Sequence, residues 1–240
     1  MKMKKIKRVF FIAAGFVCSG YMHARAADTA KIIRKFTLLC NNIRDVRGDY
    51  TLAGVISIDD KASPRANMDH VHFLFCKQGG EYYYQLGATV TLNENGAYVY
   101  IDNQNKRILV SGQKRLDYDN DIRGFGDLGA NIKFEHYKVA SKVSGTDETI
   151  SLTNDHHISC KQYAITFDRR SMKIKQLRLR LSDPRDPLRT DNEKTISVDI
   201  RQWTKTAVLS KYLTKGQVIR NVNGQWRTAE MFKQYRLTNM

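Results

Sequence analysis

The sequence predicts a mainly β protein in the α+β class: one large, curled antiparallel sheet of about ten or eleven strands with an N-terminal amphipathic helix. Three observations support this prediction. Apolar and polar residues alternate in many short segments, turn residues separate these segments, and one segment alone has clear helical spacing. Because successive side chains of a strand point to opposite faces, each segment presents one apolar and one mostly polar face.

The first 26 residues have the three parts of an export signal. Residues 2–8 are basic, and residues 9–17 are apolar but too few to span a bilayer comfortably. The tripeptide Ala24-Arg25-Ala26 then fits the small-x-small cleavage pattern. We therefore expect an exported, periplasmic protein whose mature chain, residues 27–240, forms a single domain.

The four cysteines leave two questions open. Lipid attachment at Cys18 is a less favoured alternative to cleavage, because Val17 is not the small residue that normally precedes a lipidated cysteine. The mature chain keeps Cys40, Cys76 and Cys160, an odd number that forms no disulfide framework. Buried free thiols are expected, although Cys76 and Cys160 could pair if their strands were neighbours.

The chain is basic even after removal of the signal. Its formal net charge is +16, of which residues 1–26 carry six, so the mature chain keeps +10. This excess favours an anionic partner, such as a membrane surface or a cell-envelope protein. No nucleic-acid partner is expected, because net charge alone does not indicate one.

The predicted helix follows the export signal directly. Asp28 is a good N-cap, and apolar residues recur at helical spacing as far as Ile43. From Val46 the period changes to two, which indicates the first strand.

Most of the remaining chain consists of predicted strands and turns. The sequence Asn93-Glu94-Asn95-Gly96 is typical of a hairpin turn. Residues 113–135, with three glycines among scattered apolar residues, predict a mobile loop with a helical turn near residues 126–132. After Trp203 comes a segment of uncertain type, followed by one or two terminal strands. Strands are expected over residues 50–58, 68–77, 82–86, 88–92, 98–101, 106–111, 137–143 and 148–152, and in a three-stranded meander over residues 160–203.

The apolar face of such a sheet needs a cover. A helix of about sixteen residues is only ~24 Å long, too short for the whole sheet. The sheet could pair with itself as a sandwich, close into a packed barrel, or stay partly open and hold an apolar ligand. Short turns favour one continuous curled sheet. The residues expected to line its concave apolar face are Leu52, Ile56, Phe73, Val99, Ile108, Ile165, Leu179 and Val198.

Three segments resemble the periplasmic lipoprotein carriers of the LolA type. Residues 95–111 are similar to the central hairpin of that family, and residues 163–181 with 194–200 are similar to its late strands. The resemblance covers most of residues 28–203. It implies an unclosed eleven-stranded barrel with a helical lid, a non-enzymatic carrier function without cofactors, and lipoprotein acyl chains as cargo.

Two features depart from this family pattern. The lid-locking arginine of the family is matched only by Arg65, where the neighbouring proline is displaced. The chain also continues past Trp203 with a block that typical carriers lack.

Basic and histidine residues suggest further sites. His70 and His72 share a strand face, but no third metal-ligating residue lies at a recognisable sequence spacing from them, so no metal site is expected. No nucleophile motif or phosphate loop is present, which gives no support for an enzyme. A basic hairpin could be a solvated face or could contact an anionic partner; it contains Arg169, Arg170, Lys173, Lys175, Arg178 and Arg180.

Two functions follow from these observations. The first is a carrier or chaperone that binds lipoprotein acyl chains or similar apolar cargo on the concave face of the sheet. The alternative is a cell-envelope interaction or structural protein, whose sheet is filled by its own side chains and whose basic face docks a partner. A hollow interior would favour the first function and a filled interior the second.

Overall fold

The computed structural model describes residues 28–42, 48–114, 135–183 and 185–239. The predicted export signal with Cys18, and the helical turn predicted near residues 126–132, lie outside these ranges. Residues 28–42 form a helix, as the spacing predicted. In the described part of the chain, no helix is long and apolar enough to cross a membrane.

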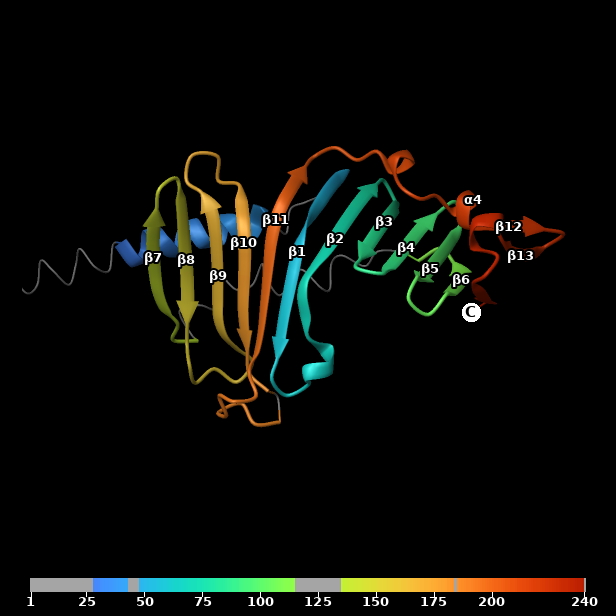
Figure 1. The fold of residues 1–240 in the computed structure, drawn as a ribbon. Helices are drawn as coiled ribbons and strands as arrows, with labels where there is room; N and C mark the ends of the chain where they lie inside the picture. Colours follow the sequence, from blue (N-terminus) through green and yellow to red (C-terminus); the bar gives the residue numbers. More distant parts are fainter. Residues whose placement is uncertain (1–27, 43–47, 115–134, 184, 240) are drawn as a thin grey trace, which may run out of the picture.

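Twelve strands form one sheet, in the order β14-β6-β5-β4-β3-β2-β1-β11-β10-β9-β8-β7, and β12 pairs with β13 in a small second sheet (Figure 1). The strands of the N-terminal half are β1 (Tyr50–Asp60), β2 (Met68–Gln78), β3 (Glu81–Leu86), β4 (Thr89–Glu94), β5 (Ala97–Asp102) and β6 (Arg107–Gly112). Those of the C-terminal half are β7 (Lys138–Ser144), β8 (Asp147–Thr153), β9 (Cys160–Asp168), β10 (Ile174–Leu181), β11 (Lys194–Thr204), β12 (Ile219–Val222), β13 (Gln225–Thr228) and β14 (Arg236–Asn239). Short helical turns are η1 (Pro64–Ala66), η2 (Leu209–Lys211), α4 (Lys215–Val218) and η3 (Glu230–Phe232).

The predicted fold class is confirmed: the protein is mainly β, with one large unclosed sheet and one N-terminal helix. The hairpin turn at Asn95 and Gly96 is also present, and both residues have the positive φ that such turns require. One strand departs from the antiparallel expectation, because β14 pairs with β6 in parallel. Residues 113–235 separate β6 from β14 in the chain, and parallel pairing requires a long connection between the two strands.

The helix packs on one face of the sheet, which we call the helix face. Phe36, Leu39 and Cys40 are buried against Ile150, Ile165 and other residues of β8 to β10. In Figure 1 the helix, drawn in blue, crosses behind β7 to β10. This cluster covers one end of the helix face.

The other face of the sheet, the opposite face, is covered at its other end by residues 205–239, which we call the C-terminal block. Val218, Ile219 and Phe232 of this block are buried against side chains of β2 to β6. Val99 and Ile108 belong to this cluster and are fully buried. The sheet therefore packs part of the chain against each of its two faces, at different ends.

The central strands are bent. Four shifts of register interrupt the pairing of β2, β1, β11, β10 and β9, and each adds local twist. One shift lies between Ala53 and Gly54, where a Cβ on Gly54 would lie 2.0 Å from the backbone oxygen of Asp199. Only glycine fits this close approach of β1 and β11, so Gly54 sets the bend at the middle of the sheet.

Candidate functional site

The candidate site is the middle of the helix face, between the helix cluster and the end of the sheet that bears the C-terminal block. Nine apolar side chains of β1, β2, β10 and β11 lie here, each only partly buried, and none belongs to either buried cluster. We call this set the central apolar surface: Leu52, Ile56, Ile58, Val71, Phe73, Phe75, Leu179, Ile196 and Val198.

Register shows that these side chains share one face. Ile56 is opposite both Val71 and Val198, and Ile196 is opposite both Ile58 and Leu179. Residues paired across neighbouring strands project to the same side of a sheet. The surface is therefore continuous across four strands, and a contiguous apolar patch of this kind is typical of a binding surface.

The helix is too small to cover this surface. Its fifteen residues measure about 22 Å along the axis. Twelve strands at a spacing of about 4.8 Å make a sheet roughly 53 Å wide. The buried cluster beneath the described helix extends to Leu177, Ile200 and Trp203 at the edge of the central apolar surface, but it includes none of the nine members of that surface.

Aromatic side chains border the surface on β1 and β3. The Phe75 ring lies 5.5 Å from that of Tyr50, 5.7 Å from Tyr82 and 6.0 Å from Tyr84, measured between centroids. Burial, and then the neighbouring Tyr98, raise the pKa of Tyr82 to about 12, and burial also raises the pKa of Tyr84. These phenols stay neutral at physiological pH, so the border offers hydroxyl groups without charge.

One ion pair ties the helix to the sheet. Lys35 Nζ lies 2.7 Å from Glu148 Oε2, and the Ser141 hydroxyl donates to the other carboxylate oxygen at 2.7 Å. Burial alone would raise the pKa of Glu148, but these two hydrogen bonds and the charges of Lys35 and Arg169 outweigh it and lower the pKa. Glu148 is therefore ionised and holds the helix electrostatically.

Sequence reasoning assigned this locking role to Arg65. The structure places Arg65 in η1, exposed between the end of β1 and the start of β2. It makes no described hydrogen bond or ion pair with the helix. The Lys35–Glu148 pair was missed because its members lie 113 residues apart and belong to no motif.

The structure brings five of the eight predicted lining residues together and separates three. Leu52, Ile56, Phe73, Leu179 and Val198 belong to the central apolar surface. Ile165 shares the helix face but is buried beneath the helix.

Placing Val99 and Ile108 on the same face was wrong. Val99 pairs with Leu92, Leu92 with Tyr83, Tyr83 with Cys76, and Cys76 with Thr51, so all five side chains project to one face of the sheet. Leu52 follows Thr51 in β1 and therefore projects to the other face, the helix face. Ile108 is opposite Ile101, two residues along β5 from Val99, so both project to the opposite face. Their burial comes from the C-terminal block and not from the helix face.

Five of the six basic residues of the predicted hairpin are exposed and Arg180 is partly buried, and their charge is partly balanced. Lys175 Nζ lies 2.6 Å from Asp147, and Arg169 Nε lies 3.9 Å from Glu148. Arg180 pairs with Asp155 and lies 3.8 Å from Glu193. Arg170, Lys173 and Arg178 are exposed and have no ion pair among the described residues, so the hairpin presents less free charge than its sequence suggests.

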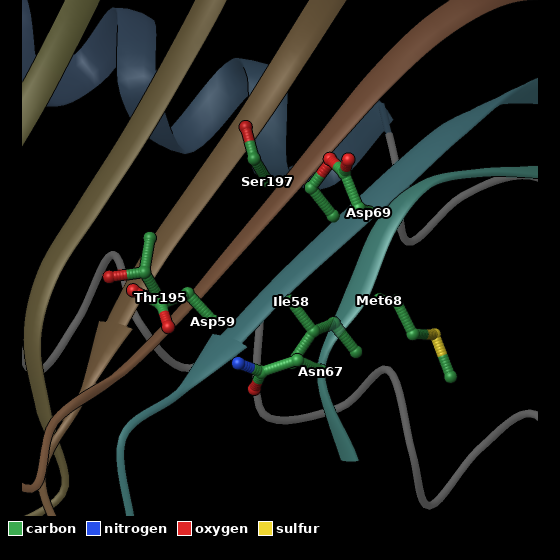
Figure 2. Close-up of a pocket in the computed structure, with 8 residues that line it drawn as sticks. Ile58, Asp59, Asn67, Met68, Asp69, Thr195 and Ser197 are labelled. Carbon is green, nitrogen blue, oxygen red and sulfur yellow. The ribbon is translucent and has the colours of Figure 1, made fainter. Parts of the chain in front are cut away.

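A separate hollow of about 350 Å³ lies where β1 and β2 diverge next to η1. Figure 2 shows the carboxylates of Asp59 and Asp69 and the hydroxyls of Thr195 and Ser197 around it. Six of its eight lining residues are polar, and Ile58 and Met68 are apolar.

Histidine and cysteine side chains form no metal-binding cluster in the described part of the chain. There, no three His, Cys, Asp or Glu side chains are placed to hold a metal ion. Cys40, Cys76 and Cys160 are buried free thiols, and burial raises the pKa of Cys40 to about 12. Cys76 and Cys160 cannot pair, because β1, β11 and β10 separate their strands by about 19 Å in total.

Comparisons with known proteins concern the fold alone. The sequence matches no protein-family profile and no curated protein. A LolA superfamily protein from Nitrosomonas europaea is 10% identical over 78% of this chain and 98% of its own, with a TM-score of 0.29. A DUF1329 family protein from Desulfovibrio piger is 8% identical over 73% of this chain and 92% of its own, with a TM-score of 0.28.

Proposed function

We propose that this protein is a non-enzymatic periplasmic carrier or chaperone that holds the acyl chains of lipoproteins, or similar apolar cargo, on its helix face. The observation that supports this proposal is the central apolar surface. It is continuous across four strands, partly exposed, and outside both buried clusters. Linear aliphatic chains need apolar contact rather than directed hydrogen bonds, and this surface offers that contact.

The surroundings of the surface also suit an amphiphilic cargo. The aliphatic side chains Ile56, Leu179 and Val198 lie in the middle, and the neutral phenols of Tyr82 and Tyr84 lie on one side. An acyl chain would occupy the middle, while the polar part of the molecule would reach the tyrosine hydroxyls or solvent. The export signal predicted over residues 1–26 supports a periplasmic location.

We further propose that the helix is a movable wall at one edge of the central apolar surface. Its described contacts with the sheet are confined to one end of the helix face, and the Lys35–Glu148 pair is its described electrostatic anchor. A small tilt of the helix would widen access to the central apolar surface without disturbing the clustered strands.

A second candidate function is the self-filled interaction or structural protein. It is favoured by the two clusters, in which Leu39, Val99, Ile108 and Ile150 are fully buried. In that case the central apolar surface would be structural, and the basic outer side chains would dock a partner. The two functions differ in whether the central apolar surface accepts a ligand.

A fluorescent fatty-acyl probe tests the proposal. We expect the folded mature protein to bind the probe stoichiometrically and Val198→Glu to abolish binding, because the new carboxylate would lie against the acyl chain. The matched control is Val143→Glu, which adds the same charge to a half-exposed strand valine on β7. Circular dichroism should show that both variants stay folded.

Two results would reject the carrier function. The first is the absence of probe binding by folded wild-type protein. The second is a Val198→Glu variant that unfolds while Val143→Glu does not, since a filled core would not tolerate the charge.

A further inference from the structure

The C-terminal block concentrates positive charge at the end of the molecule farthest from the helix. Residues 205–239 contain seven lysines and arginines and one acidic residue, Glu230. That single carboxylate is paired with Lys233 at 2.7 Å. The remaining basic side chains form no ion pair with any described acid, although Lys215 interacts electrostatically with Glu94 of β4. Most of the positive charge of the block is therefore uncompensated.

The block is held firmly against the sheet. Val218 and Ile219 are fully buried in the cluster with Val99 and Ile108, and the Tyr83 and Tyr212 rings stack with centroids 5.0 Å apart. β14 adds backbone pairing to β6. The basic side chains are therefore presented by a folded surface rather than by a loose tail.

Two pairs of arginines stand directly opposite one another in this region. Arg220 faces Arg227 across β12 and β13, and Arg236 faces Arg107 across β14 and β6. Like charges in such positions destabilise a sheet unless an anion compensates them. Arg107 is also opposite Asp102 of β5, which compensates part of its charge, so the Arg220–Arg227 pair is the stronger indication that an anionic partner binds there.

Alternation orients the first pair toward solvent. Ile219 and Trp226 project from β12 and β13 into the buried cluster, so Arg220 and Arg227 project to the other side. Both arginines are exposed. The Asn223-Gly224 turn, in which both residues have positive φ, closes the hairpin tightly beside them.

Exposed apolar side chains accompany the arginines. Val222 is 39% exposed and shares the outward side of the hairpin with Arg220, and Met231 is 71% exposed in η3. A soluble acidic partner requires charge alone, whereas a bilayer surface also accepts apolar side chains below its headgroups. We propose that the C-terminal block docks the protein on a bilayer that contains anionic phospholipids.

This docking surface is independent of the cargo function. Figure 1 shows β12, β13 and the C-terminus at one end of the sheet and the helix at the other. Docking would leave the central apolar surface accessible from the membrane side or from solvent. The vesicle experiment below can therefore succeed or fail whatever the acyl probe shows.

The test is co-sedimentation with vesicles of phosphatidylcholine with and without phosphatidylglycerol. We expect the mature protein to bind the anionic vesicles at low salt and to release them near physiological ionic strength. The double substitution Arg220→Gln/Arg227→Gln should weaken binding about 25-fold, because each basic residue near an anionic surface contributes about fivefold. Val222→Ser/Met231→Gln should weaken binding even though it changes no charge.

The matched control is Arg170→Gln/Lys173→Gln, which removes the same charge from two exposed residues of the β9–β10 hairpin, toward the other end of the sheet. Its binding should stay within about threefold of wild type, and thermal unfolding should confirm that each variant is folded. An equal loss in this control would show that net charge rather than the C-terminal block drives binding. Failure to bind anionic vesicles, or binding of a soluble poly-glutamate peptide that Val222→Ser/Met231→Gln does not affect, would overturn the membrane assignment.

Discussion

Replacing Lys35 with methionine removes the electrostatic anchor of the helix while keeping a side chain of similar length. Glu148 keeps only 6% of its side-chain surface exposed, and Lys35 keeps 32%. A hydrogen bond to a charged, buried group contributes about 2 kcal/mol. The Ser141 hydroxyl still donates to the Glu148 carboxylate, so the loss of unfolding free energy should stay below the ~3–5 kcal/mol expected for a buried charge with no remaining partner. For a chain of this size, about 2 kcal/mol corresponds to a fall in Tm of about 4–8 °C.

The pH dependence gives this prediction a second measurement. The pKa of Glu148 is lowered in the folded protein, so its stabilisation is complete above the ordinary glutamate pKa near 4.3 and is lost as the pH falls through the lower folded value. The difference in unfolding free energy between wild type and Lys35→Met should therefore be full at pH 7 and shrink below about pH 4. Denaturant unfolding followed by circular dichroism measures it at each pH.

Two controls make the interpretation specific. Lys31→Met makes the same change at an exposed position of the same helix and should alter stability by less than about 0.5 kcal/mol. The double variant Lys35→Met/Glu148→Gln should recover part of the loss, because the uncompensated charge is gone. A Lys35→Met protein as stable as wild type at pH 7, or a loss that persists unchanged at pH 3, would refute the reasoning. Faster uptake of the acyl probe by a folded Lys35→Met protein would support the role of the helix as a movable wall of the site.

Two further predictions concern the sheet. Gly54→Ala should destabilise the protein by more than about 3 kcal/mol, because the new Cβ would meet the backbone oxygen of Asp199. The control Gly80→Ala should be nearly neutral, because its Cβ would meet nothing within 4 Å. Denaturant unfolding measures the stability of both variants. Ile108→Ala should lower the free energy of unfolding by about 3–4 kcal/mol, because Ile108 is fully buried. Ile56→Ala should lower it by only about 1–2 kcal/mol, because Ile56 is partly exposed. Equal losses would show that the central apolar surface is packed like the core.

The sequence by itself determined the local structure of this protein. Alternating residues such as Ile196, Val198 and Ile200 identified the strands because the strand period of two is a property of the backbone. Helical spacing after Asp28 identified the helix, and Asn95-Gly96 identified a hairpin because few other residues adopt positive φ at low cost. The five predicted lining residues that lie on the central apolar surface were identified from this alternation together with the expectation that their strands are neighbours.

Tertiary structure decided which face each strand presents. Alternation fixes faces within a strand, but it cannot show whether Val99 and Leu52 face the same side until the register of every intervening strand is known. The C-terminal block, which buries Val99 and Ile108, crosses the opposite face through pairings that no local pattern specifies. The Lys35–Glu148 pair likewise depends on where the helix packs on the sheet, because these side chains are 113 residues apart in the sequence and meet only in the folded protein.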